Sequence, residues 1–159
     1  MENIAAWMKT TGFHRFMIEN SWPFPMAETL HFMGLTLLFG ALLAVDLRGL
    51  GFVRAIPLKH VHKLVPVALG AFSVNLLTGI AFLFADPDRY FINIAFQAKM
   101  VLIVLAGLNA LASEILVFRP LAAGADVSAS AAAKMTSGAS ILIWTFVIIA
   151  GRAIPYVEY

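Results

Sequence analysis

The stretch "LVPVALGAFSVNLLTGIAFLFA", from Leu64 to Ala85, carries no charged side chain. A helix needs about 20 apolar residues to cross the roughly 30 Å hydrocarbon core of a bilayer, and this stretch is long enough. Pro66 falls in the first turn of such a helix, where its missing N–H group is harmless. The stretch therefore predicts a membrane-spanning helix over residues 64–85.

Three further apolar runs have the same character, and they cover residues 27–45, 94–118 and 135–154. Backbone groups in lipid must hydrogen-bond to one another, so each run is expected to be helical. The chain is 61% hydrophobic and only 13% charged, whereas a soluble domain carries about 25% charge. We therefore predict an all-α fold, an integral membrane four-helix bundle over residues 26–159.

The first 25 residues are too polar to span a bilayer but carry several large apolar side chains. These are Ile4, Trp7, Met8, Phe13, Phe16 and Met17. Such a segment is expected to lie along the membrane surface as an amphipathic interfacial helix over residues 1–25. Pro23 and Pro25 are expected to exclude continuous helix between Trp22 and Pro25 and to turn the chain into the membrane.

The distribution of basic residues predicts an orientation. With four spans, both termini lie on one side of the membrane, together with the loop between the second and third spans. The opposite side carries Arg48, Arg54, Lys59, Lys63, Arg119 and Lys134, against Lys9, Arg15 and Arg89 on the terminal side. By the positive-inside rule the richer side is cytoplasmic. We expect a multi-pass protein of a bacterial inner membrane with both termini in the periplasm.

The sequence lacks the motifs that are typical of several classes of protein function. There is no cysteine, which excludes disulfides and thiolate metal sites. No Gly-rich phosphate loop, zinc-binding His-Glu helix or nucleophile elbow occurs, and whether the chain is an enzyme stays open. The sequence has no basic stripe with interleaved aromatic residues, so it does not predict nucleic-acid binding. The expected partners are the lipid bilayer and either further copies of the chain or a redox protein.

Four ionisable residues fall within the predicted spans at a similar depth, toward the periplasmic side. They are Glu28 and His31 in the first span, Lys99 in the third and Arg152 in the fourth. A charged group at the centre of a membrane helix costs about 2.5 to 3.5 kcal/mol. Such residues are therefore expected to have a partner or a function within the membrane. Glu28 and His31, three residues apart, share a helix face. We expect these residues to form a polar pocket. Thr78 of the second span lies at nearly the same depth in the membrane.

Two interpretations of this pocket stay open. In the structural one, Glu28 and Arg152 form a salt bridge, Lys99 extends to the headgroups, and His31 donates one hydrogen bond. In the functional one, His31 binds haem iron or copper, Glu28 accepts the other ring N–H, and Arg152 balances the charge of Glu28 or of haem propionates. Candidate additional ligands are His14, Met26, Met33 and Met100, because imidazole with thioether suits Cu(I) or haem iron.

The stretches "ETLHFMGLTLLFGALLAVDLRGLG" (residues 28–51) and "GRAIPY" (residues 151–156) resemble an uncharacterised family of small bacterial four-helix membrane proteins, known mainly as a domain of unknown function. The chain is also distantly similar to copper-resistance D type membrane proteins and to small b-type membrane cytochromes. In those proteins, histidines within the helices hold copper or haem. The resemblance implies that role for His31 alone, because the fourth span offers Arg152 where a second histidine would be needed.

The leading expectation is therefore an inner-membrane protein that binds haem b or copper through His31, for electron transfer or copper handling. A second ligand would come from His14, from Met100 or from a neighbouring subunit, or the haem would be five-coordinate. One alternative is a non-catalytic membrane subunit or assembly factor. Another is a proton or solute pathway in which Glu28 and His31 relay protons.

Overall fold

A computed structural model describes residues 2–125, 127 and 130–157. Four of its helices are long and apolar enough to cross a membrane: Pro23–Gly49, Leu58–Ala85, Ile94–Ala122 and Ala131–Ala153. The predicted all-α four-helix architecture is confirmed, and no β-strand occurs within these ranges. The predicted segments 1–25 and 26–159 also contain residues 1, 126, 128–129 and 158–159, which lie outside the described residues.

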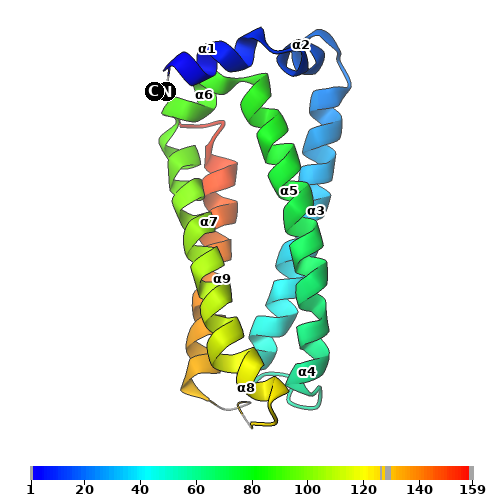
Figure 1. Ribbon diagram of the computed structural model, residues 1–159, viewed down its shortest axis with the longest axis vertical. Coiled ribbons are helices and arrows are strands. Elements are labelled where there is room, and N and C mark those ends of the chain that lie inside the picture. Colours follow the sequence, from blue (N-terminus) through cyan, green and yellow to red (C-terminus); the bar gives the residue numbers. More distant parts are fainter. Residues whose placement is uncertain (1, 126, 128–129, 158–159) are drawn as a thin grey trace.

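The spans form two antiparallel hairpins (Figure 1). Helix α3 packs on α5, α7 packs on α9, and the hairpins meet chiefly along α3 and α9. The first hairpin comprises α3 (Pro23–Gly49), the short α4 (Leu58–Val61) and η1 (His62–Leu64), and α5 (Val65–Ala85). The second comprises α7 (Ile94–Ser113), the π-helical turn η2 (Glu114–Phe118), α8 (Arg119–Ala122) and α9 (Ala131–Ala153).

The first span begins earlier than the sequence suggested. Helix α3 starts at Pro23 and includes Pro25, so the expectation that these prolines exclude helix is wrong. The first backbone N–H groups of any helix have no partner within the helix. Two prolines in the first turn therefore remove donors that would have gone unpaired anyway.

The N-terminal segment forms two short helices across one end of the bundle, which we call the capped end (Figure 1). They are α1 (Glu2–Thr10) and α2 (Gly12–Glu19). The helix is interrupted at Thr11. The Thr11 hydroxyl accepts a hydrogen bond from the backbone N–H of His14 at 3.1 Å and so caps the start of α2. Met8 and Met17 are buried against the bundle, whereas Trp7 and Phe13 are exposed.

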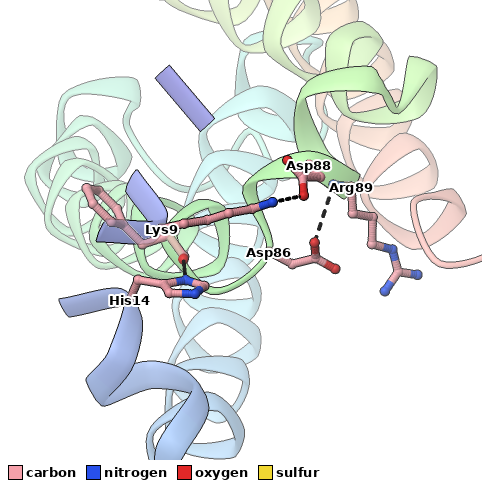
Figure 2. Close-up of polar contacts among 6 residues, drawn as sticks. Lys9, His14, Asp86, Asp88 and Arg89 are labelled. Carbon is pink, nitrogen blue, oxygen red and sulfur yellow. Dashed lines mark hydrogen bonds and ion pairs between the residues drawn. The ribbon is translucent and has the colours of Figure 1, made fainter. Parts of the chain in front are cut away.

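Polar contacts attach this cap to the end of the second span and to the short helix that follows it (Figure 2). Lys9 of α1 forms an ion pair with Asp88 of α6 (Pro87–Ile92). The Nδ1–H group of His14 donates to the backbone carbonyl of Phe84 at 2.7 Å. The cap is therefore fixed to the connection between α5 and α7. The opposite end, which carries α4 and α8, is called the loop end.

Each span buries a stripe of mostly small residues. In α3 the buried stripe includes Ala27, Gly34, Leu38, Ala41 and Val45, at spacings of three, four or seven residues. Corresponding buried positions in the other spans are Ala68, Ala71, Asn75 and Thr78 in α5, Ala95 and Ala106 in α7, and Ala133, Ser137, Ser140 and Val147 in α9. Small residues let membrane helices approach closely.

Replacement of Gly34 by valine is expected to destabilise the bundle by about 1 to 3 kcal/mol through overpacking. A Cβ atom at residue 34 would lie 2.7 Å from Asn75 Oδ1 and 3.2 Å from the backbone oxygen of Ala71, so α3 and α5 would have to separate. The control is Gly40→Val on the same helix, where a Cβ atom meets nothing within 4 Å. Thermal unfolding in detergent micelles should show a lower midpoint for the first variant only, and equal midpoints would contradict this account.

Candidate functional site

His31 is half-buried on the same side of α3 as Ala27 and Gly34, and it faces α5. Its Nδ1 atom is 2.8 Å from the hydroxyl oxygen of Thr78. Its ring packs on Phe82 with the ring centroids 5.3 Å apart. Gly79 leaves room beside the ring, because a Cβ atom there would lie 4.0 Å from His31 Cε1. The imidazole is therefore held between α3 and α5.

The hydrogen bonds of Thr78 determine the tautomer of His31. The Thr78 hydroxyl donates its single hydrogen to the backbone carbonyl of Val74, at 2.8 Å. With that hydrogen on Val74, the Thr78 oxygen accepts the hydrogen bond from His31, and the proton of the neutral ring is then on Nδ1. The other ring nitrogen, Nε2, keeps an unshared lone pair. This is the form in which a histidine can bind a metal through Nε2.

Lys99 also faces the interior. Its side chain lies against Gly151 of α9, where a Cβ atom would be 3.3 Å from the ammonium nitrogen. The charge of Lys99 is close enough to His31 for the two groups to interact electrostatically. The structure therefore brings together one imidazole from the first hairpin and one ammonium group from the second.

Glu28 and Arg152, the other two members of the expected pocket, lie outside this interior. Glu28 is exposed, and within the described part of the chain it forms no ion pair or hydrogen bond. The guanidinium group of Arg152 donates to the hydroxyl of Tyr156 at 2.8 Å and covers its ring. Glu28 directly follows the buried Ala27, and Arg152 directly follows Gly151, which faces Lys99, so each is rotated by about 100° from the interior. Thr78 takes the place beside His31 that was expected for Glu28.

The expected additional ligands do not join His31 either. Met26, Met33 and Met100 are exposed on the outer surface of the bundle. His14 lies in the cap, where its Nδ1–H group is bonded to Phe84. Among the residues that the structure describes, no group of three or more His, Asp or Glu side chains is arranged to hold a metal ion.

One interior polar atom near His31 has no partner. The side-chain oxygen of Asn75, three residues before Thr78 on α5, is buried next to Gly34 without a hydrogen bond. An unpaired buried acceptor costs about 1 to 3 kcal/mol. A donor from outside the chain, such as a water molecule or a bound ligand, would offset this cost.

Comparison with known proteins gives a family but no function. A model of a family of unknown function (DUF6644) matches residues 23–157, which run from the first residue of α3 through all four spans. No curated protein and no solved structure matches the chain. Because the match covers most of the sequence, the chain belongs to the DUF6644 family of unknown function.

Proposed function

We propose that this chain is a membrane protein that binds haem b through Nε2 of His31 and transfers electrons. The observation that carries the proposal is the hydrogen bond between the His31 ring and the Thr78 hydroxyl. Thr78 holds the Nδ1–H group at 2.8 Å, which leaves the Nε2 lone pair for iron. A hydrogen bond from the other ring nitrogen is the usual way in which proteins orient a metal-binding histidine.

The residues around His31 fit haem better than copper. Haem iron can be held by one axial histidine, and Lys99 supplies a positive charge suited to an anionic propionate group. Copper needs several nitrogen or sulfur ligands, and the methionines expected to supply sulfur are exposed. Haem would supply one-electron chemistry, and the partner would be a redox protein of the same membrane.

The distribution of charge supports a location in a bacterial inner membrane. The loop end carries Arg48, Arg54, Lys59, Lys63, Arg119 and Lys134, so it would face the cytoplasm. The cap and both termini would then lie in the periplasm. His31, eight residues after Pro23 at the start of α3, would be in the periplasmic half of the membrane.

The test is the absorption spectrum of the protein purified in mild detergent from cells supplied with a haem precursor. A Soret band and about one haem per chain in a pyridine haemochromogen assay are expected for a single axial histidine. Folded wild-type protein without haem after this treatment, and after titration with haemin, would overturn the proposal. Near-stoichiometric copper in place of haem would support copper handling instead.

Thr78→Val is expected to weaken haem binding by about 10- to 100-fold, the usual effect of removing the partner of a metal-binding histidine. Valine has the shape of threonine but cannot accept the Nδ1–H bond, so the ring loses its fixed tautomer. Haemin titration of the apoprotein measures the change. The control is Thr36→Val, because the exposed Thr36 hydroxyl bonds only to Phe32 of its own helix. Equal affinity in the two variants would show that the tautomer does not matter.

A further inference from the structure

A second feature of the interior lies in the half of the bundle nearer the loop end. A cavity of about 200 Å³ lies between α5 and α7, with α3 and α9 behind it. Its walls are mainly apolar and include Leu42, Phe72, Ile103 and Trp144. The rings of Phe72 and Trp144 meet edge to face, 6.3 Å apart. His31 does not line this cavity, so the two sites are separate.

Two carboxylates, those of Asp46 and Glu114, lie in the wall of the cavity. Asp46 is only 7% exposed and accepts hydrogen bonds from the hydroxyls of Ser137 and Ser140 on α9. Both serines are themselves buried. The carboxylate is thus fixed in position by α9 but receives only neutral donors from it.

No basic side chain among residues 2–125, 127 and 130–157 forms an ion pair with Asp46. Arg48 is near in sequence, but it donates to the backbone carbonyl of Ile56 at 2.6 Å. Glu114, the other acid of the cavity wall, has two basic neighbours: His62 at 3.6 Å and Arg119 at 3.9 Å. Asp46 is therefore the acid of this cavity whose charge is not balanced.

An ionised carboxylate buried in a membrane protein is costly unless a cation accompanies it. A metal ion would need about six oxygen ligands, whereas these walls are mostly apolar. Aromatic faces such as those of Phe72 and Trp144 attract organic cations, whose apolar groups also gain from leaving water. The wall also contains Glu114 and Phe118 of the π-helical turn η2, a distortion that is frequent at functional sites.

We propose that this cavity binds a small organic cation, an alkyl- or arylammonium whose charged nitrogen contacts Asp46 and whose apolar part packs on Phe72 and Trp144. The site lies between α5 and α7, which belong to different hairpins, and the hairpins are joined mainly through α3 and α9. A ligand can therefore enter between α5 and α7 without separating either hairpin. This binding does not depend on haem at His31.

The experiment uses the full chain in nanodiscs of zwitterionic lipid and equilibrium dialysis of radiolabelled benzyltrimethylammonium. Neopentylbenzene, which has the same shape without the charge, serves as competitor. Saturable binding is expected for the cation, and the neutral compound should displace it at least tenfold less effectively than the unlabelled cation does. Equal displacement by both would overturn the proposal, because the carboxylate would then contribute nothing.

Asp46→Asn is expected to weaken binding of the cation at least tenfold, whereas Asp46→Glu retains most of it. Asparagine can still accept the bonds from Ser137 and Ser140, so folding should be preserved, and circular dichroism checks this. Glu28→Gln is the matched control, because Glu28 is an exposed carboxylate of the same helix. Unchanged binding in Asp46→Asn, or no saturable binding by the wild type, would overturn the proposal.

A second measurement locates the ligand. In a Trp7→Phe, Trp22→Phe background, Trp144 is the only tryptophan of the chain. Its emission is expected to change over the same concentration range as binding, and the change should be shifted at least tenfold in Asp46→Asn. Binding without any change in Trp144 emission would place the cation elsewhere and contradict the site.

Discussion

Replacement of His31 by alanine is expected to abolish the Soret band of the purified protein. His31 is half-buried between α3 and α5, and the hydrogen bond between its Nδ1–H group and the Thr78 hydroxyl leaves its Nε2 atom for the iron. An axial histidine is the bond that keeps haem b in place, and none of the expected additional ligands lies beside it. Absorption spectra and haem content of wild type and variant, purified in parallel, measure the effect.

The other histidines provide the controls. His60 is exposed at the loop end, and His14 is bonded to Phe84 in the cap, so His60→Ala and His14→Ala should keep the band. Added imidazole should restore the band in His31→Ala, because the vacated space can admit the free ring. Survival of an unshifted band in His31→Ala would remove His31 from the site. Loss of the band in His14→Ala would identify a second axial ligand.

Replacement of Asn93 by alanine is expected to have the largest effect on stability, about 3 kcal/mol. Asn93 is fully buried at the start of α7, where its side-chain oxygen accepts from the backbone N–H of Phe96 at 3.0 Å. Its amide group donates to the carbonyls of Ile154 at 3.0 Å and Val157 at 3.2 Å. Loss of the helix cap costs about 1 kcal/mol, and each carbonyl left without a donor adds about 1 kcal/mol or more.

Thermal unfolding followed by circular dichroism in detergent measures this loss. Asn20→Ala is the control, since exposed Asn20 only donates to Phe16 of its own segment at 3.0 Å and should cost less than about 0.5 kcal/mol. Asn93→Asp keeps the helix cap but lacks the donor group, so its stability should fall between wild type and Asn93→Ala. A variant Asn93→Ala as stable as Asn20→Ala would show that the end of α9 is held by other contacts.

The four spans could be predicted from the sequence because the information is local. Any run such as Leu64–Ala85 must be helical in lipid whatever surrounds it, since its backbone groups have no other partners. The first and last residues of the helices were harder to predict from the sequence. Pro23 starts α3 although proline usually ends helices, and Thr11 divides the cap into two helices, because in both places the backbone conformation of a single residue decides the boundary.

The candidate site was only partly predictable. The free-energy cost of placing an ionisable group in lipid identified His31 and Lys99 as residues that must have a partner or a function, and both face the interior of the bundle. The same criterion selected Glu28 and Arg152, which it cannot distinguish from interior residues because hydropathy ignores direction around the helix axis. The positions of small residues carry that direction: Ala27, Gly34 and Leu38 define a stripe that contains position 31 but not position 28.

The sequence by itself determined that this chain is a four-span membrane protein with an N-terminal amphipathic segment, since the transfer of each side chain and peptide group into lipid is nearly independent of its partners. Only the tertiary structure decided that His31 contacts Thr78, that Lys99 lies against Gly151, and that Asp46 borders a cavity and forms no ion pair with a basic side chain of the described residues. The physical reason is that these contacts depend on which helices are neighbours and on their rotation. Both are set by close packing of small residues between spans far apart in sequence.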